Sequence, residues 1–239
     1  MCFNATTSFI ASAALIPLGL YTIEIARHGD RRYLFLAAFP LLFGLQQGLE
    51  GLLWLDLACG APSQTAGVGQ GPALGFLFFA YLVWPGLVPL AAWRVEDRPR
   101  RRRLFAVAAV LGGLLGGSLY IPLIVDPDWL QVMVVQDSIL YHPRLIYDPY
   151  VSREMVRAVY ALIVALPLVG ASNAGVRRFG MLILGSVILT ALAFGYAFVS
   201  IWCFFAALLS TYLAIRLPKQ MPERQSPVGR DGHWRFHGI

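Results

Sequence analysis

Three polar side chains lie close together in a stretch of the chain that is otherwise apolar. They are Gln46, Gln47 and Glu50, and residues three and four positions apart share one face of a helix. An ionisable residue inside a membrane helix is energetically expensive and points to a functional site by default. Glu50 could serve there as a neutral hydrogen-bond donor, a proton acceptor or a metal ligand. Equal weight goes to a polar clamp that only fixes the packing of helices.

Other reactive side chains are expected on the same side of the membrane as Glu50. A tryptophan and a cysteine lie about one turn into the last apolar segment, and a histidine lies in a long loop. Such groups can line an outward-facing polar pocket that binds a small molecule or a lipid headgroup. The residues predicted to bind this ligand are Gln46, Gln47, Glu50, Trp84, His142, Trp202 and Cys203.

A metal site is the second kind of chemistry that these residue types allow. A thiolate, an imidazole and a carboxylate together can bind zinc or copper, and the ligands in this hypothesis are Cys2, Glu50 and His142. The same residue types can make a cysteine–histidine nucleophile pair that Glu50 orients. Cys2 could instead be inert or form a disulfide with Cys59, which is expected on the same side.

Several common cofactors are excluded by the positions of the histidines and the lysine. All four histidines fall outside the apolar segments, which argues against haem and against histidine-bound chlorophyll. The single lysine, Lys219, follows the last apolar segment, so a retinal Schiff base is not expected. No nucleotide-binding motif is present. The net charge of +6 is explained by basic membrane loops, so nucleic acid is not an expected partner.

The composition predicts an all-α, polytopic integral membrane protein. Of 239 residues, 58% are hydrophobic and 13% are charged, about half of the roughly 25% that is usual in globular proteins. The mean hydropathy is +0.64. These values exclude an ordinary soluble domain and a disordered chain, so the lipid bilayer is the expected partner.

Seven apolar segments have the length of a membrane helix, which is about 20 residues, with a range of roughly 17–25. They are Ser8–Ala26, Tyr33–Leu55, Ala73–Trp93, Leu104–Val125, Met155–Ala171, Arg178–Phe194 and Phe198–Leu217. We expect a seven-helix domain over residues 1–218. The polar residues 219–239 are expected to form a cytoplasmic tail of disordered composition.

The distribution of positive charge predicts the orientation, because cytoplasmic loops are enriched in lysine and arginine. With the N-terminus outside, the inner regions would be 27–32, 94–103, 172–178 and the tail from residue 216. These regions hold all but three of the 19 basic residues, and the three outer ones are Arg144, Arg153 and Arg157. The protein is therefore predicted to be N-out and C-in.

Three further local patterns carry structural predictions. The outer loop 126–154 is longer than the usual connection and rich in apolar residues, so we expect a short interfacial helix near Trp129–Leu140. Pro85 and Pro89 each remove a backbone donor, so the third helix should be bent.

Glycines spaced by four allow close helix approach, either within the chain or toward a homo-oligomeric or complex partner. They are Gly112, Gly113, Gly116 and Gly117.

Several short motifs are spread over nearly the whole apolar part of the chain. They are the opening Met1-Cys2-Phe3-Asn4-Ala5, Pro40-Leu41-Leu42-Phe43 ahead of Gln46, Gln47 and Glu50, Trp84-Pro85 with Pro89, and Ser200 to Ala206. In these motifs the chain resembles an uncharacterised bacterial membrane family whose members begin Met-Cys-Phe-Ser-Ala, although Asn4 replaces the usual serine. The resemblance implies a seven-helix protein of the bacterial inner membrane without an established activity. It singles out Cys2, Gln46, Gln47, Glu50, Trp84 and Cys203.

Three functions stay open at this point. The first is an outward-facing pocket that binds a small molecule, a lipid headgroup or a metal ion. The second is a membrane-embedded hydrolase that depends on a metal or a cysteine. The third is a structural or accessory subunit of a membrane complex, in which Glu50 only clamps helices.

Overall fold

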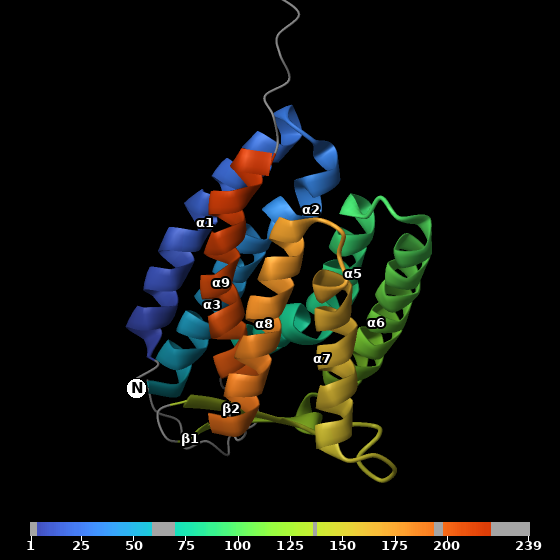
Figure 1. The fold of residues 1–239 in the computed structure, drawn as a ribbon. Coiled ribbons are helices and arrows are strands. Elements are labelled where there is room, and N and C mark those ends of the chain that lie inside the picture. Colours follow the sequence, from blue (N-terminus) through green and yellow to red (C-terminus); the bar gives the residue numbers. More distant parts are fainter. Residues whose placement is uncertain (1–3, 59–69, 136–137, 194–197, 221–239) are drawn as a thin grey trace, which may run out of the picture.

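In the part of the chain that the structure describes, helical passes run alternately between two ends of the molecule, and a β-hairpin lies across one end (Figure 1). This is the arrangement in a computed structural model, which describes residues 4–58, 70–135, 138–193 and 198–220. The elements before the hairpin are α1 (Ala5–His28), η1 (Arg31–Tyr33), α2 (Leu34–Ala37), α3 (Phe39–Ala58), α4 (Gln70–Leu77), the π-helical η2 (Phe78–Val83), α5 (Trp84–Val95), α6 (Pro99–Val125) and η3 (Pro127–Trp129). The hairpin and the elements after it are β1 (Leu130–Val135), β2 (Ser138–Pro143), α7 (Arg153–Val169), α8 (Ala174–Ala193) and α9 (Phe198–Gln220).

Side-chain caps explain where three of the helices begin. The Oδ1 atom of Asn4 accepts a hydrogen bond from the N–H of Thr7 at 3.0 Å and so caps α1. Ser152 caps α7 in the same way, by accepting from the N–H of Met155 at 3.3 Å. Asn173 precedes α8 and accepts from the backbone N–H groups at the start of that helix. The cap at Ser152 matters most below, because it sets where the first turn of α7 begins.

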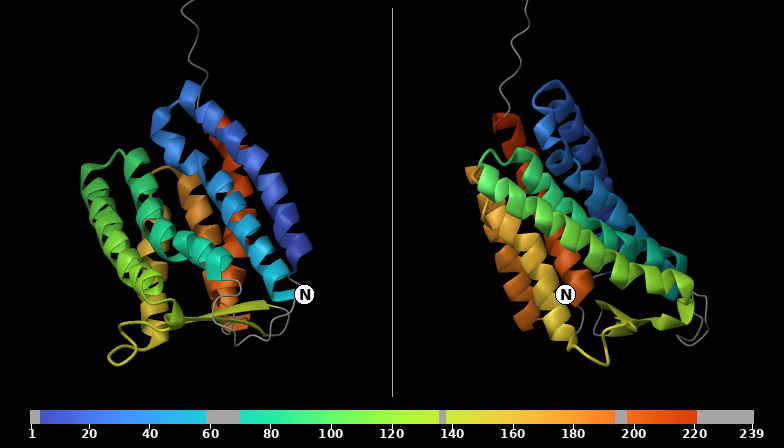
Figure 2. Two further views of the ribbon diagram at one scale, coloured as in Figure 1. Left: turned by 180° about the vertical axis from the view of Figure 1, so that it is seen from behind. Right: turned by 90° about the vertical axis from the view of Figure 1, so that its right-hand side faces the viewer.

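The loops separate into the two groups that the charge pattern predicts. The helix α1 begins at the hairpin end, and α3, α6 and α8 end there (Figures 1 and 2). The opposite end contains η1, the α5–α6 turn and the α7–α8 turn. This opposite end holds Arg31, Arg32, Arg94 and Arg102, and we call it the arginine-rich end. The fold therefore agrees with the predicted grouping of loops.

Six helical stretches within the described ranges are long and apolar enough to cross a membrane. The helix α7 is not one of them, because it has 17 residues and carries Arg153, Glu154 and Arg157 at its start. It nevertheless packs in the bundle against α5, α6 and α8. The fold thus supports a helical, membrane-spanning protein, and seven crossings are part of the proposal made below.

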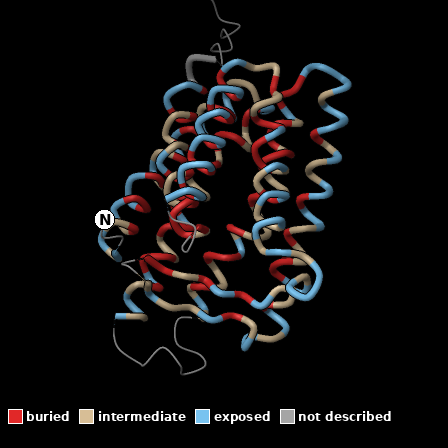
Figure 3. The backbone as a smooth tube through the Cα atoms, turned by 60° about the horizontal axis from the view of Figure 1, so that its bottom comes forward, coloured by how far each residue is buried: buried red, intermediate tan, exposed pale blue. Residues whose placement is uncertain are grey.

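The outward faces of the helices are covered with large apolar side chains. Leu104 and Leu114 on α6 are each 67% exposed, and Leu192 on α8 is 83% exposed. Figure 3 shows exposed residues along the outer sides of the helices and buried residues toward the interior. Water would disfavour so much exposed hydrocarbon, whereas lipid tails would cover it at no cost. This surface fits the bilayer that the composition predicts.

The third pass is bent, as its prolines predict. The π-helical turn η2 separates α4 from α5, and Pro85 lies in the first turn of α5. Proline has no N–H, so it cannot donate to the carbonyl of Tyr81 four residues earlier. Figure 2 shows α4 turned away from the axis of α5.

The bend is packed against the paired glycines of α6. A Cβ atom at Gly112 would lie 1.8 Å from the carbonyl oxygen of Pro85, and one at Gly116 would lie 2.6 Å from the carbonyl oxygen of Tyr81. Only glycine permits this approach of two backbones. The face with Gly112 and Gly116 is therefore used inside the chain, which is the first of the two predicted uses. A Cβ at Gly113 would meet nothing within 4 Å.

The long outer loop contains a β-hairpin, so the prediction of an interfacial helix near Trp129–Leu140 is wrong. Strands β1 and β2 pair antiparallel, with Val132 opposite Tyr141. In the second half of β2, Tyr141 is buried while His142 is exposed. This alternation has the period of a strand, and the β-branched residues of both segments favour the same conformation. The hairpin can thereby lay one face on the bundle and leave the other outside.

At the arginine-rich end, Glu96 ties two turns of the bundle together. Its carboxylate accepts hydrogen bonds from the N–H of Ser172 at 2.8 Å, from the Ser172 hydroxyl at 2.6 Å and from the N–H of Arg98 at 3.0 Å. Partial burial raises the pKa of Glu96, but these hydrogen bonds and the nearby Arg101 outweigh it, so the pKa lies below its ordinary value.

This lowered pKa predicts how stability changes in acid. A carboxyl group with a depressed folded-state pKa stabilises the fold above its unfolded pKa, and the contribution is lost as the pH falls through the folded value. We expect Glu96→Gln to remove part of the acid-dependent fall in Tm below the ordinary glutamate pKa of 4.5. At pH 7 the variant should lose about 2–4 °C for each kcal/mol of stabilisation removed. Thermal unfolding of both proteins between pH 3 and pH 7 measures this, and identical pH profiles would contradict it.

Candidate functional site

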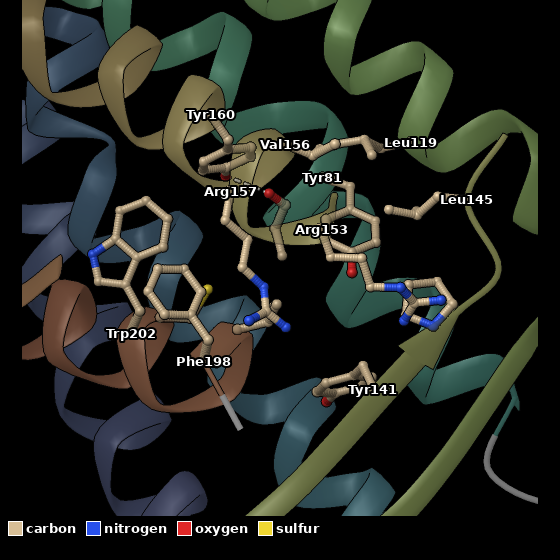
Figure 4. A pocket seen from close by; sticks show the side chains of 14 residues that line it. Tyr81, Leu119, Tyr141, Leu145, Arg153, Val156, Arg157, Tyr160, Phe198 and Trp202 are labelled. Atoms are coloured by element: carbon tan, nitrogen blue, oxygen red, sulfur yellow. Dashed lines mark hydrogen bonds between the residues drawn. The ribbon is translucent and has the colours of Figure 1, made fainter. Parts of the chain in front are cut away.

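A cavity lies at the hairpin end, between α7, α9, η2 and the buried face of the hairpin (Figure 4). Its volume is about 80 Å³, which is several times the space that one water molecule requires. We call this cavity the hairpin pocket. Its polar lining consists of Tyr81, Tyr141, Arg153, Arg157, Tyr160 and Cys203.

The first two turns of α7 supply the charged side of the hairpin pocket. Arg153, Val156, Arg157 and Tyr160 all line it. They follow the spacing of three and four residues that places side chains on one face of a helix. Figure 4 shows both arginine side chains extending from α7 into the pocket.

The two arginines have different surroundings. Arg153 donates two hydrogen bonds to the carboxylate of Asp148, at 2.9 and 3.0 Å. Burial raises the pKa of Asp148, but the hydrogen bonds from Arg153 and the N–H of Leu145 lower it overall. The guanidinium of Arg157 lies over the ring of Phe198, with 5.7 Å between its central carbon and the ring centroid. The pocket wall therefore contains one arginine held by a carboxylate and one stacked on an aromatic ring.

Two hydrogen-bond donors on the pocket wall have no partner among the described residues. They are the hydroxyl of Tyr141 and the indole N–H of Trp202, and both atoms are buried. Burial holds the pKa of Tyr141 well above its ordinary value, so its hydroxyl stays a neutral donor. The hydroxyl of Tyr160 is occupied, because it donates to the carbonyl of Ala80. Buried donors are normally paired in native proteins, so unpaired ones mark places where a ligand can supply acceptors.

The structure brings together five of the seven residues predicted to bind a ligand. The indole N–H of Trp84 donates to Oε1 of Gln46 at 2.8 Å, and the amide of Gln47 donates to Glu50 at 3.1 Å. The thiol of Cys203 lies beside Gln46. The carboxylate of Glu50 also accepts from the hydroxyl of Ser200 on α9. We call these side chains the Glu50 cluster: Gln46, Gln47, Glu50, Trp84, Ser200 and Cys203.

The Glu50 cluster lies behind the hairpin pocket and shares Cys203 with its wall. Glu50 is 3% exposed and does not line the pocket. Tyr141 and Cys203 do line it, and both are close enough to Glu50 for its charge to act on them. Gln46, Gln47 and Glu50 are thus not among the residues that line the hairpin pocket, and their role in binding a ligand stays a prediction. They support the wall from behind, while Trp202 and Cys203 are part of it.

His142 lies away from this site. Tyr141 is buried on the face of β2 toward the bundle, so the next residue, His142, lies on the opposite, exposed face. Its imidazole is therefore not placed with Glu50 or Cys203, so these described residues do not form a cysteine–histidine pair. Cys2 and Cys59 lie outside the described residues. Within the described residues, no three His, Cys, Asp or Glu side chains gather as metal ligands would.

The residues that give the pocket its charge were not predicted as site residues from the sequence. Arg153 and Arg157 were counted only as outer-loop charges, and Tyr81 and Tyr160 were not singled out. A usable signal was present, because two arginines four residues apart begin an otherwise apolar helix. Charged residues near a membrane helix usually face the bundle interior or a cavity.

One comparison with known proteins gives a match. A family model, described as a family of unknown function (DUF6629), matches residues 1–227 and so covers every described helix and strand. No curated protein and no solved structure matches the chain. The function must therefore be argued from the site.

Proposed function

The chain belongs to DUF6629, a family of unknown function, and we propose that it binds a small anionic molecule in the hairpin pocket. The observation that supports this most directly is the placement of Arg153 and Arg157 together on the wall of one cavity. Guanidinium groups bind carboxylates and phosphates through charge-assisted hydrogen bonds. The hydroxyl of Tyr141, which has no partner among the described residues, adds one further hydrogen-bond donor on the pocket wall.

The rest of the lining favours an anion that also carries an apolar or aromatic body. Tyr81, Tyr160, Phe198 and Trp202 surround the arginines. Ligand pockets commonly combine such apolar walls with a few polar groups that fix orientation. A hydrated inorganic ion would leave these walls uncovered, whereas a small organic anion would cover them.

The proposed setting is the bacterial cytoplasmic membrane, with seven crossings and the hairpin end outside. The arginine-rich end carries most of the positive charge, and the positive-inside rule assigns that end to the cytoplasm. The helix α7 can make the seventh crossing because 17 residues reach the lower end of the usual range, roughly 17–25. In this orientation the hairpin pocket takes its ligand from outside the cell.

For the Glu50 cluster we propose the role of a helix clamp. Its carboxylate joins α3 to α9 through Ser200, and its two hydrogen-bond partners among the described residues, Ser200 and Gln47, are neutral. This is what the packing alternative in the sequence analysis predicted. The clamp holds Cys203 and Trp202 of α9 at the pocket wall.

The clamp predicts different results for two substitutions of Glu50. Glu50→Gln should keep an acceptor for Ser200 and lose less than about 1 kcal/mol. Glu50→Leu leaves the Ser200 hydroxyl and the Gln47 amide without an acceptor, which costs about 1–3 kcal/mol for buried groups. We expect the Tm of Glu50→Leu to fall by several degrees more than that of Glu50→Gln. Equal losses in thermal unfolding would show that hydrogen bonding at Glu50 does not clamp the helices.

Anion binding is tested with the purified full chain and matched pairs of probes. We expect benzoate or phenyl phosphate to raise the Tm and to bind in calorimetry. The neutral counterparts, benzamide and phenol, should bind at least tenfold more weakly, because they lack the charge that the arginines recognise. No binding of either anion, or equal binding of anions and neutral counterparts, would overturn the proposal.

A further inference from the structure

A second cavity lies deeper in the bundle than the hairpin pocket. Its volume is about 30 Å³, and five helices supply its walls. The wall residues are almost all apolar and include Phe39, Val88, Val164, Phe179, Ile183 and Ala206. We call it the inner cavity. An apolar cavity of this kind stays dry and accepts hydrocarbon.

Three residues line both cavities, so the two spaces share a wall. They are Tyr160, Trp202 and Cys203. The rings of Tyr160 and Trp202 meet edge to face, with centroids 5.5 Å apart. The hairpin pocket therefore adjoins the inner cavity at a pair of aromatic side chains, without an intervening helix.

A single face of α7 leads from the charged groups into the inner cavity. Arg153 and Arg157 line the hairpin pocket, Tyr160 lines both cavities, and Val164 and Leu168 line the inner one. Leu168 is eleven residues beyond Arg157, which is about 16 Å along a helix at 1.5 Å per residue. The side chains on this face of α7 therefore change from two charged guanidinium groups at the hairpin pocket to apolar side chains at the inner cavity.

We infer that the ligand is a small amphiphile, an organic monoanion with a short unbranched alkyl tail. The head lies at Arg157 and the tail passes the Tyr160–Trp202 pair into the inner cavity. This inference rests on the proposed anion binding and adds the class of ligand. A polar tail is disfavoured, because burying a polar group without a hydrogen bond costs free energy. The small volume of the inner cavity selects a tail of a few carbons, as in a medium-chain alkanoate.

The test measures how affinity depends on tail length. Butanoate, hexanoate and octanoate are titrated into the purified full chain. Burial of each methylene group contributes about 0.8 kcal/mol, so affinity should rise roughly fourfold for each methylene that enters the inner cavity. We expect this rise in the natural protein until the cavity is full.

Two substitutions on α7 separate specific tail binding from partition into detergent. Val164→Phe fills the inner cavity and should abolish the gain in affinity from butanoate to octanoate. Leu166→Phe is the matched control, because Leu166 is 60% exposed on the outer side of the same helix. It should behave like the natural protein. Ala206→Leu, on the α9 wall of the same cavity, repeats the test if Val164→Phe does not fold.

The outcomes distinguish this inference from the proposed function. If butanoate binds but tail length has no effect, or has the same effect in the cavity-filling and control variants, the amphiphile inference is wrong and anion binding stands. If none of the alkanoates binds although benzoate does, the inference fails alone. If benzoate, phenyl phosphate and the alkanoates all fail to bind, both proposals are wrong.

Discussion

Arg157→Gln should weaken benzoate binding by about 10- to 100-fold, the range that follows from about 1.5–3 kcal/mol for hydrogen bonds to charged groups. The side chain keeps its approximate length and polarity but loses the charge. Arg153→Gln should also weaken benzoate binding, because Arg153 lines the same pocket and its charge is lost in this variant. Calorimetric titration of each purified variant measures the loss.

The matched control for this prediction is Arg144→Gln. Arg144 lies at the same end of the molecule, next to the hairpin, and is stacked over Trp129 instead of lining the pocket. Its removal lowers the local positive charge without touching the proposed contact. If Arg144→Gln weakens benzoate as strongly as Arg157→Gln, then general electrostatic attraction explains the binding. An unchanged affinity in Arg157→Gln would place the anion elsewhere.

Gly112→Val should cause the largest loss of stability among single substitutions. Its Cβ would lie 1.8 Å from the carbonyl oxygen of Pro85, so α6 must move away from α5. Overpacking of a tight interface typically costs about 1–3 kcal/mol, and a clash with a rigid backbone lies at the upper end or beyond. For a chain of this size we expect Tm to fall by roughly 6–12 °C, at about 2–4 °C per kcal/mol.

Gly113→Val is the matched control, one residue along the same helix. A Cβ at Gly113 meets nothing within 4 Å, so this substitution should leave Tm nearly unchanged. Size-exclusion chromatography of both variants also tests the predicted homo-oligomer. If Gly113→Val dissociates a dimer while Gly112→Val does not, the exposed glycine face joins two copies. A stable Gly112→Val protein would contradict the packing of α6 against the bend.

The helical parts of the fold could be predicted because lipid imposes simple rules on sequence. A membrane helix needs a long apolar run, and its loops need a consistent charge bias. These rules found the apolar passes and the grouping of loops at two ends. That Gln46, Gln47 and Glu50 need partners also followed from a rule, since polar groups inside a bilayer must find partners within the protein. The identity of those partners was less accessible. Ser200 is one of many small polar residues, and only the packing of α9 on α3 selects it.

The features that the sequence did not reveal depend on the direction in which side chains point in the folded protein. The hairpin strands are short and lie beside long apolar segments, so a period of two was hard to separate from an interfacial helix. His142 was placed in the site by its membrane side alone, although the alternation of β2 turns it outward. Arg153 and Arg157 were visible as charges, but their inward direction follows from how α7 packs against its neighbours. The side of the membrane on which a residue lies can be predicted from the sequence. Which face of a helix or strand meets a cavity is decided only when the elements pack together.

The most direct test of anion binding in the hairpin pocket is the position of a heavy atom carried by a bound anion. Crystals of the full chain grown with 4-iodobenzoate would locate the iodine by its anomalous signal. Our account predicts a carboxylate within hydrogen-bonding distance of Arg157 and an iodine peak beside the Tyr160–Trp202 pair, within the hairpin pocket. An iodine peak outside the hairpin pocket, or none in crystals of a protein that binds the probe in solution, would contradict it.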